Sequence, residues 1–181
     1  IMNILFIGQF CIADGDGWGD ATKDIARSLL TQDCNLVLRN INMANAPKIK
    51  INKDLEPYLN KKLPNYDIVI QKVLPNLLTY DGRFKQNITI QAFETELPRT
   101  HAWLNKLSIM DKVFVFSTQE VKWLSNYHKS VSYIGEAIDI NIANKKYNPI
   151  HPIFEQNIFK FYCINSATER KNLDTIVSAY L

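Results

Sequence analysis

The chain has 181 residues, of which 46% are hydrophobic and 22% charged, and its formal net charge is +3. This composition is that of a globular protein with a sizeable core and argues against the disordered and fibrous classes. The charge is far below that of a nucleic-acid binder, and no run approaches the about 18 apolar residues of a membrane span. Because Cys11, Cys34 and Cys163 show no metal or redox spacing, we expect reduced thiols in a cytoplasmic protein.

Short apolar segments alternate with helical ones along the first three quarters of the chain. The segments expected to be strands are residues 3–8, 35–39, 67–71, 87–91, 112–116 and 131–134. A helix is expected over residues 20–30, with Asp20 as its N-cap, and the spacing of Ser117 and Glu120 is a capping box that starts another helix. This alternation predicts an α/β fold, a Rossmann-like parallel sheet flanked by helices, over residues 1–140.

The end of the chain is organised differently. Residues 141–157 show neither strand nor helix periodicity and carry two prolines, so we interpret them as an interdomain linker. Residues 158–181 hold one apolar strand pattern and one helical stripe, which cannot bury their own apolar faces. We expect this segment to be the truncated start of a second Rossmann-like domain, covered by a partner or by a second copy of the chain.

A glycine-rich loop, residues 14–20 (Asp-Gly-Asp-Gly-Trp-Gly-Asp), lies between the first strand and the first helix. Glycines let a ligand approach the backbone, and a helix N-terminus offers N–H groups to an anion. The alternative is a flexible surface turn. A dinucleotide site is disfavoured, because the G-x-G-x-x-G spacing is absent and no acidic residue follows the second strand.

Two further segments combine charged residues with a favourable position. The stretch 93–103 follows the fourth strand, where ligands bind in parallel sheets, and Glu94 is its best functional candidate. In the same stretch Trp103 is better explained by helix packing. Arg170 and Lys171 precede the last helix, where two cations oppose the helix dipole unless an anion such as a diphosphate lies between them. A solvated basic pair is the alternative.

The order and spacing of these segments resemble the retaining glycosyltransferases of the GT-B fold, family-four type. The resemblance covers nearly the whole chain. The matching segments are residues 2–8 with 21–30, the pair Phe93-Glu94 with Pro98, Trp103 and Asn105, then 111–117, 133–139 and 170–174. It implies that residues 1–140 are the acceptor-side half of a GT-B fold and that residues 158–181 open the domain that binds a nucleotide sugar.

The resemblance also implies a reaction and roles for individual residues. A hexosyltransferase of this type moves a sugar from a nucleotide diphosphate sugar to a carbohydrate, lipid or protein acceptor with retention, and it needs no metal or other cofactor. The residues implied to contact the donor are Gly17, Gly19, Arg170 and Lys171. Those implied to line the acceptor side are Trp18, Glu94 and Thr95, with Glu94 as the candidate catalytic residue. The isolated fragment is expected to be inactive.

Two other functions remain open from the sequence. A non-catalytic binding or partner module, derived from a glycosyltransferase, would account for the incomplete second domain. It predicts exposed apolar surface on residues 158–181 that a partner or a second copy covers. A nicotinamide or flavin oxidoreductase is a minor third reading. We assign no metal to His101, His128 or His151, which lack ligand spacing.

Overall fold

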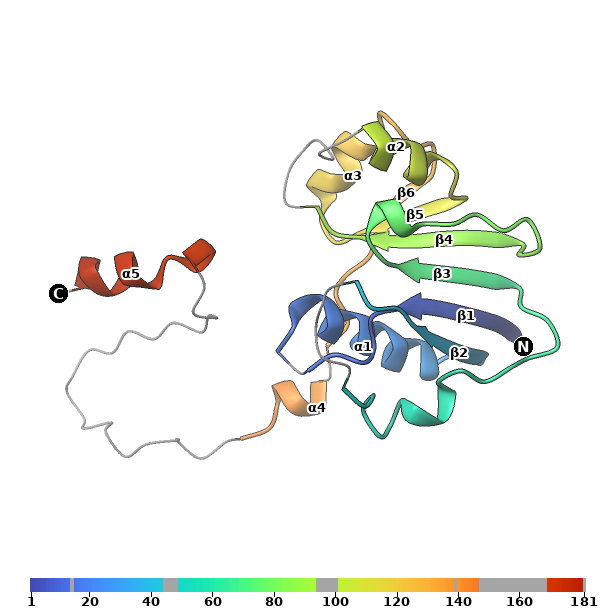
Figure 1. Ribbon diagram of the computed structural model, residues 1–181, viewed down its shortest axis with the longest axis horizontal. Coiled ribbons are helices and arrows are strands. Elements are labelled where there is room, and N and C mark those ends of the chain that lie inside the picture. The colour runs from blue at the N-terminus through green and yellow to red at the C-terminus, as the bar shows by residue number, and fades with distance from the viewer. Residues whose placement is uncertain (14, 44–48, 94–100, 139, 147–168, 181) are drawn as a thin grey trace. The chain divides into compact units, whose positions relative to one another are not determined.

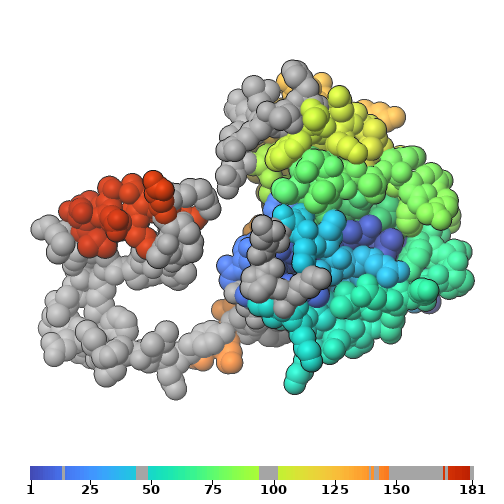
Figure 2. All heavy atoms as spheres, in the orientation of Figure 1, coloured from blue at the N-terminus to red at the C-terminus, as the bar shows by residue number. Residues whose placement is uncertain are grey.

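The computed structural model describes residues 1–13, 15–43, 49–93, 101–138, 140–146 and 169–180 (Figure 1). The chain divides into two units, Ile1–Ala143 and Asn144–Leu181. In the first unit, atoms from its beginning (blue) to its last strands (yellow) lie together in one body (Figure 2). A membrane-crossing helix would need about 18 apolar residues in a row, and the helices within the described ranges include none of that kind.

The first unit is built on a six-stranded sheet in which every neighbouring pair is parallel. Its strands are β1 (Met2–Gly8), β2 (Cys34–Asn40), β3 (Ile68–Lys72), β4 (Gln86–Gln91), β5 (Lys112–Val115) and β6 (Val131–Tyr133). Their spatial order is β2-β1-β3-β4-β5-β6. The predicted Rossmann-like parallel sheet is confirmed, and each predicted strand end lies within about one residue of the observed one.

Helices cover both faces of this sheet, as predicted. Helix α1 (Gly17–Leu30) and the short η1 (Glu56–Tyr58) pack on one face, and α2 (His101–Ser108) and α3 (Thr118–Leu124) pack on the other. Strand β5 shows the division, because Phe114 packs in the first cluster and its neighbours Val113 and Val115 in the second. The short η2 (Pro75–Leu77) and α4 (Ile140–Ala143) complete the unit.

The two helix starts that the sequence located have different outcomes. Helix α3 begins as predicted, since the Ser117 hydroxyl accepts from the Glu120 N–H at 3.1 Å. The predicted N-cap of α1 is wrong. Its N-cap is Asp16, whose carboxylate accepts from the Gly19 N–H at 2.7 Å, and Asp20 lies inside the first turn. Glycine has a low helix propensity, so the sequence pattern placed the first turn in the preceding loop.

Buried polar side chains hold the connection from β3 to β4, which contains only η2. The Gln71 side-chain amide donates to the Thr79 carbonyl at 2.6 Å and accepts from the Thr79 N–H at 3.1 Å. Asn87, which is completely buried, makes the same double contact with the backbone of Asp81, at 3.0 and 3.1 Å. Backbone groups of Thr79 and Asp81 in this crossover are therefore paired with side chains of the sheet.

The second unit contains η3 (Glu169–Lys171) and α5 (Leu173–Tyr180) among its described residues. The predicted helical stripe that begins at Leu173 is confirmed as a helix. The predicted strand at 159–164 and all but the first residues of the predicted linker lie outside the described residues.

We expect Asn87→Ala to lower the free energy of unfolding by about 1–3 kcal/mol, because it removes the partner of the Asp81 N–H and one of the hydrogen bonds to the Asp81 carbonyl, which also accepts from the Phe84 N–H. Urea unfolding of the purified protein measures the change. Asn35→Ala is the matched control, because the exposed Asn35 side chain donates to the Asn3 side chain and has no other partner among the described residues. This substitution should change stability by no more than about 0.5 kcal/mol. Equal losses in both variants would contradict this account.

Candidate functional site

The sheet has one topological switch point, between β1 and β3. The chain runs from β1 to β2 on one side and then returns to β3 on the other. Gly8 and Lys72, the last residues of β1 and β3, are register partners, and the arrowheads of the two strands lie side by side (Figure 1). In open parallel sheets, ligands bind in the crevice outside the strand ends at such a point. The β1–α1 loop and the end of β3 are therefore the candidate site.

The loop leaves β1 in a direction that β2 determines. Asn40, the last residue of β2, accepts with its side-chain oxygen from the N–H groups of Phe10 and Cys11, both at 2.8 Å. The ring of Phe10 packs edge-on against Phe6, with centroids 5.3 Å apart. These contacts anchor the loop at the carboxyl edge of the sheet.

The protein's own carboxylates occupy the N-terminus of α1. In addition to the Asp16 cap, Asp20 accepts from the Gly15 N–H at 2.7 Å. The ammonium of buried Lys23 lies 3.1 Å from Asp20 and donates to the Ile12 carbonyl. Two donors that the sequence offered to an anion are thus bound internally, and a phosphate at the Gly19 N–H would have to displace Asp16.

Gly17 and Gly19 play different parts in this turn. A Cβ atom on Gly19 would overlap the Cγ2 of Ile12 and would lie 3.3 Å from the Asp16 carboxylate. A Cβ atom on Gly17 would meet nothing within 4 Å, and Gly17 is exposed. Gly19 is therefore required for internal packing, whereas Gly17 has open space beside its backbone for a ligand.

A pair of alanine substitutions separates these two roles. We expect Gly19→Ala to lower the free energy of unfolding by about 1–3 kcal/mol through overpacking against Ile12. Gly17→Ala should leave it unchanged or raise it by up to about 1 kcal/mol, because alanine has the higher helix propensity. Thermal and urea unfolding measure both variants, and a larger loss from Gly17→Ala than from Gly19→Ala would contradict the assignment.

Sequence reasoning missed the most unusual residue at this edge, Lys72. Its side chain is only 1% exposed. The ammonium donates to the Trp18 carbonyl at 3.1 Å and lies 3.9 Å from the centroid of the Trp18 ring. Among the described residues, no carboxylate forms an ion pair with it. The sequence feature that could have identified it is a lysine at the end of an apolar strand, because parallel strands present ligand-binding residues there.

The environment of Lys72 disfavours its charged form. Burial lowers the pKa of Lys72 from 10.5 to about 8, against the opposing negative charges of Glu136 and Asp16. Below about pH 8 the folded protein carries a buried ammonium that the unfolded chain keeps in water. A shift of this size corresponds to a stability cost of about 3 kcal/mol.

This cost has a defined pH dependence. The folded-state pKa of Lys72 lies below the unfolded value, so the cost is complete below about pH 8 and disappears as pH rises toward 10.5. We expect Lys72→Met to be more stable than the wild type near neutral pH, with a difference that falls by about 2–3 kcal/mol between about pH 7 and about pH 10. Urea unfolding across this range measures it, and a difference that stays constant with pH would contradict the assignment.

The remaining predicted site residues lie elsewhere. Glu94 and Thr95 fall outside the described residues; the chain enters that segment from Phe93, whose N–H donates to buried Glu120 at 2.6 Å. Lys171 lies in η3 of the second unit and is half-buried, and the side chain of Arg170 is outside the described part. The structure thus brings together Gly17, Trp18 and Gly19, and it adds Lys72 to them.

The cysteine and histidine side chains that the structure describes are half-buried or buried. Cys11 and Cys34 are free and half-buried, and burial raises the pKa of both thiols, which keeps them protonated. Buried His128 bonds the Met110 carbonyl at 2.9 Å and the Ser130 N–H at 3.0 Å with its two ring nitrogens. Within the described ranges, no three His, Cys, Asp or Glu side chains gather as metal ligands would.

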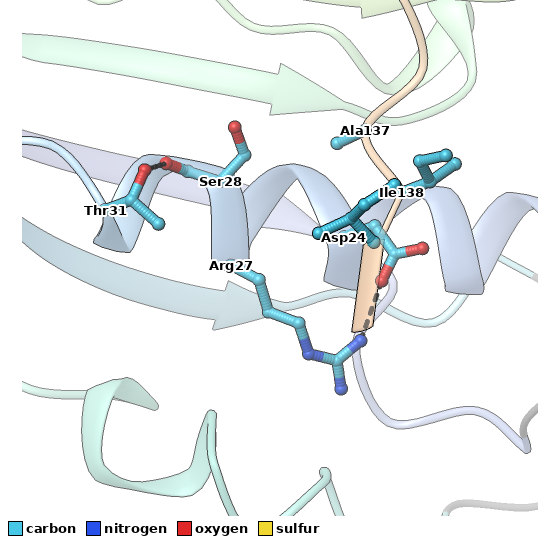
Figure 3. Close-up of a pocket in the computed structure, with 7 residues that line it drawn as sticks. Asp24, Arg27, Ser28, Thr31, Ala137 and Ile138 are labelled. Atoms are coloured by element: carbon cyan, nitrogen blue, oxygen red, sulfur yellow. Dashed lines mark hydrogen bonds and ion pairs between the residues drawn. The ribbon is translucent and has the colours of Figure 1, made fainter. Parts of the chain in front are cut away.

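A groove of about 400 Å³ lies apart from this site, between the C-terminal half of α1 and the segment that precedes α4 (Figure 3). It is lined by Asp24, Arg27, Ser28, Thr31, Ala137, Ile138 and Ile140. Arg27 forms ion pairs at 2.8 Å with both Asp24 and Asp54, so its charge is already neutralised. The groove shares no residue with the switch-point site and offers no comparable polar group.

Comparisons of the chain with protein-family models, with curated proteins and with solved structures find no match. The residues at the switch point and the order of the segments along the chain therefore carry the functional interpretation.

Proposed function

We propose that the protein is a retaining glycosyltransferase of the GT-B type, which transfers a sugar from a nucleotide diphosphate sugar to an acceptor. The first unit would form the acceptor-side domain, and the second unit would belong to the domain that binds the nucleotide sugar. The observation that best supports this proposal is the position of the glycine-rich loop, which starts α1 at the switch point of an all-parallel sheet. The motif order in the sequence then selects this enzyme class among those that use such a loop.

The leaving diphosphate needs positive charge, and we assign this role to Arg170 and Lys171. They lie in η3, directly before α5, where a helix N-terminus adds a favourable dipole. The N–H groups of Gly15 and Gly19 are bound to Asp20 and Asp16, so α1 is poorly suited to hold a diphosphate.

The acidic turn of α1 suits the sugar groups better. Carboxylates and backbone groups pair with hydroxyls, and Gly17 leaves room beside its backbone. We assign the acceptor side to Trp18, with Glu94 and Thr95 following β4 in the sequence. Phe93 precedes them at the same edge of the sheet, where Glu120 holds its N–H. Glu94 is the candidate catalytic carboxylate of this proposal.

The oxidoreductase alternative has little support at β2. A dinucleotide-binding domain needs a carboxylate near the end of this strand for the ribose hydroxyls. Here β2 ends at Asn40, whose side-chain oxygen is bound to the Phe10 and Cys11 N–H groups. This position thus anchors the loop.

A second candidate function is a non-catalytic partner module. The apolar side chains of Ile176 and Val177 on α5 are 46% and 56% exposed, which supports a surface that another chain covers. Light scattering tests this candidate, because a monomer at all concentrations would count against a self-associating module.

The glycosyltransferase proposal is tested by sugar transfer in the intact gene product, with a panel of nucleotide diphosphate sugars. We expect Lys171→Ala to lower kcat by about 100-fold or more, because it removes a charge that stabilises the leaving group. Lys146→Ala, at an exposed lysine of the same unit, is the control and should retain activity. Normal turnover by Lys171→Ala would remove this residue from the site, and no transfer from any donor would refute the function.

A further inference from the structure

Burial of the Lys72 ammonium lowers the stability of the folded protein, and this residue lies at the switch point of the sheet. A buried ammonium whose only hydrogen bond among the described residues goes to a neutral carbonyl is an unfavourable arrangement. Methionine would fill nearly the same space without the charge. Groups that a fold retains against its stability concentrate at functional sites. The contacts of this ammonium indicate what it does there.

Among the described residues, the two closest contacts of the ammonium are with the same residue. It donates to the Trp18 carbonyl, which also accepts from the Thr22 hydroxyl at 2.7 Å. It lies over the Trp18 ring at 3.9 Å from the centroid, whereas the ring of Phe116 is 6.0 Å away. A desolvated cation–π contact stabilises by about 2 kcal/mol. Lys72 therefore links the end of β3 to the backbone and to the side chain of the first turn of α1.

Within the described part of the chain, no other polar group contacts the ring of Trp18. Its indole Nε1 is buried and has no hydrogen-bond partner among the described residues. Buried indole N–H groups usually find an acceptor, and that acceptor then sets the ring orientation. Here the ammonium on the ring face is the polar contact that remains.

We propose that Lys72 is a positioning residue for the glycine-rich loop: it holds the carbonyl and ring of Trp18, so that the first turn of α1 presents Gly17 to the bound substrate. This inference rests on the proposed function, since it takes the loop as the part of the site that meets the sugar groups. It adds a residue that no sequence motif contains.

The charged groups around Lys72 define its pH response. The negative charges of Glu136, which follows β6, and of Asp16, the N-cap of α1, both act on its ammonium. Because the pKa of Lys72 is about 8, the ammonium becomes a neutral amine in mildly alkaline solution. A neutral amine still donates to the Trp18 carbonyl but loses the attraction to the ring. The ring is then held less firmly.

The indole N–H resonance of Trp18 reports this link without any ligand. The resonance is assigned by its loss in Trp18→Phe. In the wild type its chemical shift should change with pH, with a midpoint near pH 8. In Lys72→Met it should be displaced and insensitive to pH in this range. Amide exchange of residues 17–20 should accelerate about tenfold in Lys72→Met, although the variant is at least as stable globally.

Lys112→Met is the matched control for these measurements. Lys112 also lies over an aromatic ring, 4.9 Å from the centroid of Phe114, but it begins β5 at the opposite edge of the sheet. This variant should leave the Trp18 resonance and the exchange of residues 17–20 as in the wild type.

Kinetics of sugar transfer by the intact gene product and its variants test whether the contact between Lys72 and Trp18 affects the substrate. We expect Lys72→Met to lower kcat/KM about tenfold, mainly through KM, and Lys72→Arg to recover part of the loss because it keeps a charge that stacks on the ring. A Trp18 resonance that is identical in Lys72→Met and the wild type overturns the inference, and so does a displaced resonance with unchanged kcat/KM. If the wild type transfers no sugar, the proposed function and the substrate role of Lys72 both fail, while the resonance alone decides whether Lys72 holds Trp18.

Discussion

The parallel pairing of β1 with both β2 and β3 is the constraint on which the candidate site depends. It places Asn40, Gly8 and Lys72 in one row across the carboxyl edge of the sheet. Each member of this row holds the segment that follows β1. Asn40 binds the N–H groups at the start of the loop, and Lys72 binds the first turn of α1. Gly8 lets α1 approach closely, because a Cβ atom there would collide with the Thr22 methyl group. A change in strand register would disconnect all three contacts at once.

At this edge of the sheet, carboxylates and an ammonium lie near one another, but not all of them form ion pairs. Asp16 and Asp20 neutralise the helix N-terminus from within, whereas Lys72 is separated from both carboxylates that act on it. Because the Gly15 and Gly19 N–H groups are bound to the protein's own carboxylates, this helix end differs from the phosphate-binding helix ends of nucleotide-binding folds, where free N–H groups meet the anion. The proposal accordingly separates a sugar-facing first unit from a diphosphate-facing second unit.

Much of the fold was predictable from the sequence, because its strands are short apolar runs between polar segments and α3 begins with a capping box. The start of α1 was not, since its first turn contains Gly17 and Gly19, and local propensity opposes a helix there. The site was predictable only in outline. The sequence treats the two glycines alike, whereas a tertiary contact with Ile12 distinguishes them. The sequence did not point to Lys72, because the role of its side chain depends on a contact with Trp18, 54 positions earlier in the chain.

The lowered pKa of Lys72 has a consequence for chemical reactivity. Near neutral pH a larger fraction of this side chain is a free amine, which is a nucleophile, than of a solvated lysine, because burial lowers its pKa. Burial against the Trp18 ring shields that amine from dissolved electrophiles. Whenever the first turn of α1 opens, Lys72 is uncovered, and its pKa returns toward the ordinary lysine value because burial no longer lowers it. The rate at which an amine-specific reagent labels it therefore counts the openings of the turn.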